Sequence, residues 1–270
     1  MQSPFDTLEK VRKQKPLVHH ITNWVTIYDS ANVVRAFGAL PVMAHATEEA
    51  ADMAGISSAL VLNIGTLTRD VIDSMLLAGE KANEKGIPIV LDAVGAGATK
   101  FRNEQVSRLI GGLEISVIKG NAGELASIAG IKSEVRGVES ISAGAPPEKI
   151  CSKIAGELGC TAVITGKTDV SASKKGVYFI DNGHQMMGAV VGTGCMAASA
   201  IGAFCAVEKD CALASAHALS CFGIAGELAA KESKGPGTFK ANFYDEIYNL
   251  DRAKVEKYAK VRFDAAKESR

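Results

Sequence analysis

The residue pattern most suited to chemistry is the tetrapeptide Gly192-Thr193-Gly194-Cys195, which lies between an apolar run ending near Val191 and a stretch of small residues. Glycines let the backbone turn tightly and approach a ligand closely. A helix that begins directly after such a turn offers free backbone N–H groups and the positive end of its dipole. We therefore predict an anion-binding turn whose natural occupant is a phosphate-like group.

Cys195 is the first residue after the glycine turn. At a helix N-terminus the pKa of a thiol can fall below its usual value, which would suit a nucleophile or a weak base. The alternative is a small apolar side chain buried in an Ala-rich helix. The position of Cys195 favours involvement in a site.

Asp92 and Glu124 each follow an apolar run and have two alternative interpretations. Two carboxylates at the same edge of a sheet could hold Mg²⁺ through water, as sites of phosphate transfer commonly do. Alternatively, Asp92 caps a turn and Glu124 lies in the first turn of a helix. The five histidines show no H-x-x-x-H spacing and are expected to be structural.

Short apolar runs alternate with segments of helical periodicity along the chain. Their Val and Ile content is typical of strands that are buried on both faces. The runs cover residues 17–21, 59–63, 88–92, 115–119, 162–165, 177–180 and 185–190, and the helical segments 68–85, 147–158, 196–207 and 213–231. This alternation predicts an α/β fold: a three-layer α/β/α arrangement with a mainly parallel central sheet.

The sequence contains neither a linker of low complexity nor an internal repeat, so residues 1–270 are expected to form a single domain. Residues 132–147 are predicted to be a surface loop. Residues 251–270 are predicted to form a final surface helix, with Val255, Tyr258, Ala259 and Phe263 facing inward. In a parallel sheet, ligands bind at the carboxyl ends of the strands, where Gly, Asn and Asp recur in this chain.

Composition and motifs exclude several classes of function. The 30 Lys and Arg balance the 30 Asp and Glu, which does not favour nucleic-acid or membrane-surface partners. No G-x-x-x-x-G-K-[ST] occurs, so a P-loop kinase is excluded. Residues 192–197 match G-x-G-x-x-A, but a dinucleotide-binding fingerprint normally opens the first βαβ unit and needs an acidic residue about 20 positions later.

The remaining global features indicate a reduced, cytoplasmic protein. No two of the six cysteines have C-x-x-C spacing, and residues 1–15 lack the apolar core of a signal peptide. Residues 186–207 are uncharged over a length that could cross a bilayer, but consist mostly of Gly, Ala, Ser and Thr. Such residues gain little on transfer to lipid, so no membrane span is expected.

Taken together, the motifs resemble those of the hydroxyethylthiazole kinases of the ribokinase-like superfamily. The matching stretches occur in order along nearly the whole chain: HITN (20–23), GALPVMAHA (38–46), LNIGTL (62–67), LDAVGAGAT (91–99), KGNAGE (119–124), VITG (163–166) and GTGC (192–195). The resemblance implies ATP-dependent phosphorylation of the primary alcohol of 4-methyl-5-(2-hydroxyethyl)thiazole, in the salvage of thiamine phosphate. It also implies Mg²⁺ and a homotrimer with the thiazole site at subunit interfaces.

The resemblance also implies roles for individual residues. Met43, Gly192 and Asn23 would contact the thiazole, Lys119 and Thr165 would bind ATP phosphates, and Asp92 and Glu124 would serve Mg²⁺. Gly192, Thr193, Gly194 and Cys195 would form the anion hole over the transferred phosphoryl group. The family often has Arg where Lys119 stands and Pro where Ala93 stands. Lys keeps the charge but lacks the bidentate fork of Arg.

Three rival functions remain open at this stage. A ribokinase-like kinase of hydroxymethylpyrimidine or pyridoxal, or a nucleotide-dependent dehydratase of the same fold, is expected to carry Asp in place of Cys195. A hydrolase with Cys195 as nucleophile would need a histidine partner, and the spacing suggests none.

Overall fold

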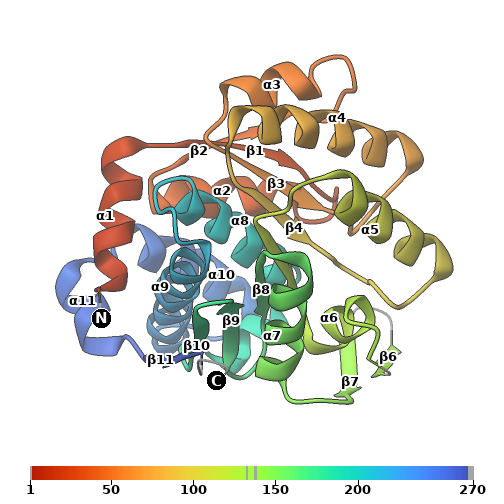
Figure 1. Ribbon diagram of the computed structural model, residues 1–270. Coiled ribbons are helices and arrows are strands. Elements are labelled where there is room, and N and C mark those ends of the chain that lie inside the picture. Colours follow the sequence, from red (N-terminus) through yellow and green to blue (C-terminus); the bar gives the residue numbers. More distant parts are fainter. Residues whose placement is uncertain (1, 132, 137–138, 267–270) are drawn as a thin grey trace.

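The computed structural model describes residues 2–131, 133–136 and 139–266 (Figure 1). The strands are β1 (Leu17–Ile21), β2 (Leu40–Met43), β3 (Ala59–Asn63), β4 (Ile89–Asp92), β5 (Val117–Gly120), β6 (Ser133–Arg136), β7 (Glu139–Ala143), β8 (Thr161–Ile164), β9 (Asp169–Ser173), β10 (Gly176–Ile180) and β11 (Val261–Ala265). The helices are α1 (Pro4–Gln14), α2 (Ile27–Phe37), α3 (Ala50–Ile56), α4 (Arg69–Lys85), α5 (Lys100–Gly112), α6 (Ala122–Ile128), α7 (Pro147–Leu158), α8 (Thr193–Cys205), α9 (Cys211–Lys231), α10 (Pro236–Tyr248), α11 (Arg252–Tyr258) and the 3-10 helix η1 (Gln185–Ala189).

One nine-stranded sheet runs through the molecule in the order β11-β10-β9-β8-β5-β4-β3-β1-β2. The strands from β2 to β8 pair in parallel, and β9, β10 and β11 extend the sheet with antiparallel pairs. Strands β6 and β7 pair antiparallel and form a separate two-stranded sheet. The predicted α/β fold with a mainly parallel central sheet is therefore confirmed.

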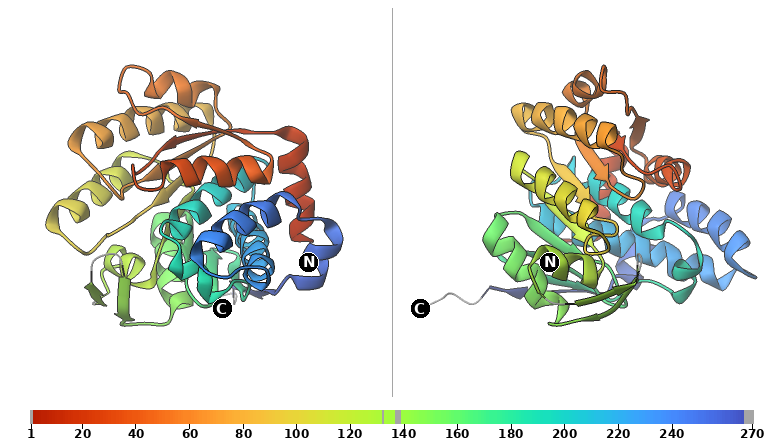
Figure 2. Two further views of the ribbon diagram at one scale, coloured as in Figure 1. Left: turned by 180° about the vertical axis from the view of Figure 1, so that it is seen from behind. Right: turned by 90° about the vertical axis from the view of Figure 1, so that its right-hand side faces the viewer.

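Helices cover both faces of this sheet. The clusters of buried apolar side chains place α1, α2, α8, α9 and α10 on one face and α3, α4, α5, α6 and α7 on the other. The right-hand view of Figure 2 shows the sheet edge-on between these two layers. Strand β3 shows why both faces need helices: Val61 packs with the first layer, whereas Leu60 and Leu62 pack with the second. Successive side chains of a strand point to opposite faces, so an all-apolar strand needs cover on both.

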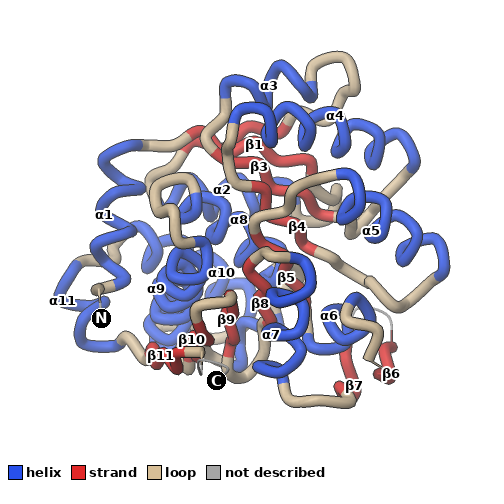
Figure 3. The backbone as a smooth tube through the Cα atoms, in the orientation of Figure 1, coloured by secondary structure: helices blue, strands red, loops and turns tan. Residues whose placement is uncertain are grey.

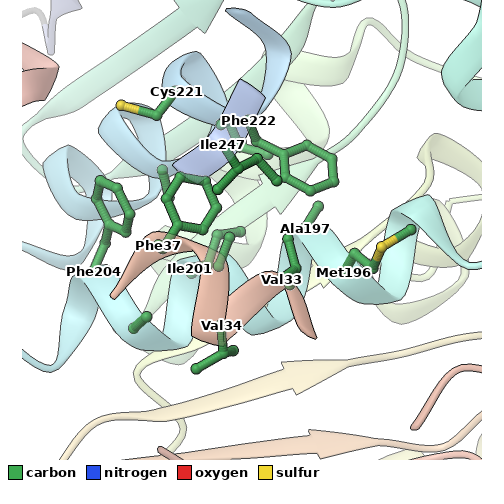
Figure 4. Packing of buried hydrophobic residues seen from close by; sticks show 14 of the residues in the cluster. Val33, Val34, Phe37, Met196, Ala197, Ile201, Phe204, Cys221, Phe222 and Ile247 are labelled. Carbon is green, nitrogen blue, oxygen red and sulfur yellow. The ribbon is translucent and has the colours of Figure 1, made fainter. Parts of the chain in front are cut away.

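The close packing of α8 against the sheet depends on its small residues. A Cβ atom added at Gly202 would lie 2.4 Å from Cγ2 of Val61 in β3, so only glycine fits there. On its outer side α8 packs against α2, where the rings of Phe37 and Phe204 meet edge to face at 5.4 Å, beside Ile201 (Figure 4). This packing brings the N-terminus of α8 close to the ends of the central strands.

The apolar helices lie in the core. Helix α9 is the one described helix that is long and apolar enough to span a bilayer, but 78% of its most apolar window is buried inside the protein. Helix α8, which contains most of the uncharged stretch at 186–207, has 13 residues. Both helices belong to the same cluster of buried side chains.

Several local predictions are wrong. Residues 185–190 do not form a strand but the 3-10 helix η1, which begins after the cap residue His184. Residues 132–147 contain strands β6 and β7 and the start of α7 rather than only a loop; residues 132, 137 and 138 lie outside the described residues. Strands β2 and β9 were not predicted.

The predicted terminal helix at 251–270 is also wrong in its second half. Helix α11 buries Val255 as expected and ends at Tyr258. The chain then forms β11, where the ring of Phe263 packs against Tyr178 of β10 at 4.5 Å. Pairing with β10 decides the conformation here, because an exposed sheet edge stabilises a strand whose own sequence is ambiguous. Residues 267–270 lie outside the described residues.

The buried His217 of α9 makes stability depend on pH. Its Nδ1 lies 2.8 Å from Oγ1 of Thr7 in α1, and burial lowers the pKa of His217 to about 4. The unfolded chain binds a proton below a pH of about 6.5 whereas the folded chain does not, so stability falls as pH decreases from 6.5 toward 4.

We predict that His217→Gln weakens this dependence. Gln can keep a hydrogen bond to Thr7 but does not titrate. In urea unfolding, the loss of free energy of unfolding between pH 6.5 and pH 5 should be about 1.5 kcal/mol smaller in the variant than in the native protein. The same loss in both proteins would show that His217 is not held neutral in the fold.

Candidate active site

A chain of buried polar side chains crosses the carboxyl ends of four neighbouring strands. Nδ2 of Asn23 donates to Oδ1 of Asn63 at 2.9 Å, and Nδ2 of Asn63 donates to Oδ2 of Asp92 at 2.7 Å. Nζ of Lys119 lies 3.0 Å from Oδ1 of Asp92 and 2.9 Å from the carbonyl oxygen of Gly194. The chain therefore connects the ends of β1, β3, β4 and β5 to the N-terminus of α8, and all four side chains are at least 96% buried.

The register of the parallel sheet creates this contact series. Asn63 pairs with Asp92 across β3 and β4, and Asp92 pairs with Lys119 across β4 and β5. Figure 3 shows β1, β3, β4 and β5 side by side in the middle of the molecule. Residues at the same register on adjacent strands point to the same side, so three polar side chains in successive strands must meet.

The glycine turn forms the start of α8, although no strand precedes it. Gly192 is the N-cap residue with φ of 91°, in the left-handed region that favours glycine. A Cβ atom at this position would lie 2.3 Å from Cγ2 of Thr26. The backbone N–H groups of residues 193–195 have no acceptor within the helix, as expected for a first turn. They offer three donors and the positive end of the helix dipole to an anion.

Cys195 lies beside the polar chain. Its Sγ accepts a hydrogen bond from Nδ2 of Asn23 at 3.4 Å. Burial, with the nearby charge of Asp92, raises the pKa of Cys195, so the lowered pKa considered from the sequence is wrong. In this position desolvation outweighs the helix dipole. Among the contacts described for Cys195 there is no histidine, which removes the support for a Cys-His hydrolase.

Lys119 and Asp92 form a buried ion pair at the centre of the site. Their side chains are 4% and 0% exposed. Burial raises the pKa of Asp92, whereas Lys119 and the hydrogen bond from Asn63 oppose that shift. Burial lowers the pKa of Lys119, but the charge of Asp92, with a further contribution from Glu124, raises the pKa overall. The pair with Asp92 thus favours the charged form of Lys119 next to the glycine turn.

Glu124 lies in the first turn of α6, as one of its two interpretations predicted, and there it takes part in a capping box with Asn121. Its Oε1 accepts from the backbone N–H of Gly95 and its Oε2 from that of Asn121, each at 2.7 Å. Burial raises the pKa of Glu124, and the charge of Asp92 adds to that shift.

The carboxylates of Asp92 and Glu124 fit Mg²⁺ only if other ligands complete its coordination. The described residues contain no group of three His, Cys, Asp or Glu that could hold a metal. Each carboxylate oxygen accepts few hydrogen bonds and keeps lone pairs for a cation or its water. One or two carboxylates, waters and substrate phosphates are the usual ligands of Mg²⁺ beside a nucleotide. The two residues therefore fit a metal that is shared with a bound phosphate.

A cavity of about 810 Å³ opens beside the glycine turn. Its volume lies within the range of sites for cofactors and other small molecules. Thr165, Thr193 and Gly194 line it, and the backbone N–H of Thr165 is held by the carbonyl of Gly120. A larger cavity, of about 940 Å³, is lined by residues such as Pro88 and Ser116 at the opposite ends of the strands and contains none of the predicted site residues.

Met43 lies at the same edge of the sheet as Asn23. It ends β2 and pairs in register with His20 of β1. Nearby, the ring of Trp24 stacks on His45 with centroids 4.8 Å apart. Trp24 and its neighbour Val25 are more than half exposed. This side of the glycine turn is therefore apolar and open, whereas the polar chain lies beneath it.

Two residues of the site were missed by sequence reasoning. Asn63 links Asn23 to Asp92, and its position at the end of a buried strand was the one signal available. Arg102 of α5 donates hydrogen bonds to the carbonyls of Ile64, Gly65 and Val94 and so fixes the loops after β3 and β4. Nothing in the local sequence distinguishes Arg102 from other helix cations.

Comparisons with known proteins identify several similar chains. The model of the hydroxyethylthiazole kinase family matches residues 8–253. A curated hydroxyethylthiazole kinase of Methanosarcina mazei is 56% identical over 261 residues, which is 97% of this chain and 99% of the relative. The solved hydroxyethylthiazole kinase of Pyrococcus horikoshii superposes with a TM-score of 0.88 at 40% identity and covers 97% of this chain and 98% of its own.

A more distant structure shows the fold alone. A ribokinase-like superfamily protein from Enterococcus faecalis superposes with a TM-score of 0.60 at 14% identity. It covers 96% of this chain and 95% of its own.

We predict that Gly192→Ala destabilises the protein by about 1–3 kcal/mol, because the new methyl group would overlap Thr26 and adopt a strained φ. Urea unfolding measures this effect. Gly237→Ala in α10, where a Cβ would have no neighbour within 4 Å, is the matched control and should change the free energy of unfolding by less than about 0.5 kcal/mol.

A second variant separates the overlap from the strain. Thr26→Ser removes Cγ2 and keeps the hydroxyl that donates to Oδ1 of Asn23 at 3.1 Å. In this background Gly192→Ala should cost less than in the native protein. An unchanged stability of Gly192→Ala alone would contradict the described geometry of the turn.

Proposed function

The chain belongs to the hydroxyethylthiazole kinase family, whose members act on an alcohol group, and from this we propose that it transfers the γ-phosphoryl group of ATP to 4-methyl-5-(2-hydroxyethyl)thiazole. The product would enter thiamine phosphate synthesis. The observation that carries the proposal is the glycine turn at the N-terminus of α8, which lies between a cavity of nucleotide size and an apolar, open edge.

The nucleotide occupies the cavity beside α8 in this proposal. Its phosphates approach the free N–H groups at residues 193–195, in a cavity that Thr165 also lines. Lys119 contributes its charge from beneath the turn. Fixed donors and a nearby cation are what phosphoryl transfer requires, because the reaction depends mainly on positioning and on stabilising charge.

Asp92 and Glu124 hold Mg²⁺ together with the phosphates in this proposal. When bound, the ion neutralises part of the charge on the transferred group. The hydrogen bonds from Lys119 and Asn63 favour the carboxylate form of Asp92 and oppose the effect of burial on its pKa. Lys119 and Asn63 both belong to the polar chain described above, so Asp92 is held in position before any ligand binds.

The thiazole alcohol binds on the apolar side of the turn, against Met43, Gly192 and Asn23. Oδ1 of Asn23 accepts three hydrogen bonds from Val25 and Thr26, which fixes the amide in one orientation. Cys195 lines the site where the hydroxyl meets the phosphoryl group. With its raised pKa it is a neutral thiol rather than a strong base, and phosphoryl transfer requires little proton removal before the transition state.

We also propose a cytoplasmic homotrimer of single-domain subunits with the thiazole site at the subunit interface. Exposed apolar side chains next to the site support the interface. Trp24, Val25, Tyr28 and Val191 are each between 58% and 75% exposed, and large exposed apolar patches often mark protein contacts. The continuous sheet, with strands from both ends of the described chain, supports the single domain.

The sequence left two other ribokinase-like activities open. Kinases of hydroxymethylpyrimidine or pyridoxal, and a nucleotide-dependent dehydratase, are expected to have Asp at the position of Cys195. The family match over residues 8–253 favours the thiazole alcohol over both.

Substrate choice is tested by offering the thiazole alcohol, hydroxymethylpyrimidine and pyridoxal in parallel with Mg-ATP. We expect ADP release and phosphorylated product with the thiazole alcohol, at a kcat/KM at least about 100-fold above the other two, because the side of the glycine turn proposed to bind the alcohol is apolar. Product is identified by mass spectrometry. Phosphorylation of only the pyrimidine or pyridoxal would contradict the substrate and leave the kinase class intact.

The role of Cys195 is tested by two substitutions. Cys195→Asp should keep or raise kcat, because a carboxylate can accept the hydroxyl proton and Lys119 stabilises its charge. Cys195→Leu should lower kcat at least about tenfold, because a larger side chain crowds the anion hole. Circular dichroism checks that both variants fold. A folded Cys195→Asp protein without turnover would show that Cys195 does not face the reacting groups.

A further inference from the structure

Lys119 forms an ion pair with Asp92, the carboxylate that is proposed to bind the metal. Its Nζ lies 3.0 Å from Oδ1 of Asp92, while Oδ2 of the same carboxylate accepts from Asn63. Neither side chain of the ion pair is more than 4% exposed. Each oxygen of the Asp92 carboxylate therefore already has a partner in the protein, and one of these partners carries a full positive charge.

A second cation at Asp92 would face Lys119 at short range. Like charges a few ångströms apart repel strongly where water is excluded. Lys119 is held in place from a second side, because Nζ also donates to the carbonyl of Gly194 at 2.9 Å. The backbone of Gly194 approaches so closely that a Cβ there would lie 3.3 Å from Nζ. The ammonium group is therefore fixed against both Asp92 and the turn.

We infer that Lys119 is the resident counter-ion of Asp92 and keeps divalent metal ions off this carboxylate until a triphosphate binds. The inference rests on the proposed function, since it assumes the metal role of Asp92. The negative charges of the phosphates allow the ammonium and the metal to share the site, so the metal arrives with the nucleotide. Lys119 acts here as a positioning residue that sets the order of binding.

The test measures metal binding in the full-length protein without nucleotide. Mn²⁺ serves as the probe, and the free ion is counted by electron paramagnetic resonance. Lys119→Met removes the charge at nearly constant volume and should bind Mn²⁺ at least about tenfold more tightly than the native protein. Lys119→Arg keeps the charge and should bind like the native protein.

Further variants locate the site. Adding Asp92→Asn to Lys119→Met removes the unpaired carboxylate and should abolish the gain in affinity. Lys119→Gln, which keeps a donor for the Gly194 carbonyl, replaces Lys119→Met if that variant does not fold. Divalent metal should also raise the melting temperature of the uncharged variants and leave that of the native protein nearly unchanged, since binding to the folded state stabilises it.

Equal Mn²⁺ affinity of the native protein and the uncharged variants would overturn the inference. So would a gain in affinity that survives Asp92→Asn. Assays of the native enzyme with Mg-ATP and the thiazole alcohol run alongside. Turnover without a gain in metal binding by the variants rejects the counter-ion role alone, whereas a gain in metal binding without turnover of this alcohol rejects the proposed function alone.

Discussion

The ion pair of Lys119 and Asp92 is the interaction on which the site depends. Removing two charges from water is costly, and an apolar pair of the same size would often be at least as stable. The pair is therefore not a sign that the fold gains stability here. Its effect is to constrain the geometry of the site. By joining β4, β5 and the first turn of α8, it fixes the position of the glycine turn relative to the strand ends. Loss of either partner alone would leave a buried charge, at a cost of about 3–5 kcal/mol.

The fold creates the conditions for this pair. Parallel pairing in register brings Asn63, Asp92 and Lys119 to one edge of the sheet, and the small residues of α8 allow that helix to lie directly on β3. Packing of α2 against α8 then holds the helix in place from its other side. The apolar packing of α8 between β3 and α2 thus positions the polar site at the strand ends.

Much of this was predictable from sequence, for identifiable physical reasons. The strands that are buried on both faces and the glycine turn have strong local signals, because they need apolar runs or glycine. The predicted strand bounds lie within two residues of those observed for β1, β3, β4, β5, β8 and β10, and α7 was placed at its observed bounds. Strand β11 and helix η1 were missed because pairing with β10 and capping by His184 decide their conformations.

The site was predictable to a smaller extent. Asp92, Lys119 and Gly194 were identified as separate residues at strand and helix ends, but their direct contacts depend on register, which one sequence does not specify. The direction of the pKa shift at Cys195 was wrong because burial, rather than the helix dipole, dominates there. Arg102 acts through three backbone carbonyls, an interaction with no sequence signature.

A crystal structure with Mg²⁺, a non-hydrolysable ATP analogue and the thiazole alcohol tests the central claim most directly. The account predicts the terminal phosphate on the backbone N–H groups of residues 193–195, with the substrate hydroxyl beside Cys195 and Lys119 beneath the turn. A triphosphate bound in another cavity, with the turn at 192–195 free of ligand, would contradict it.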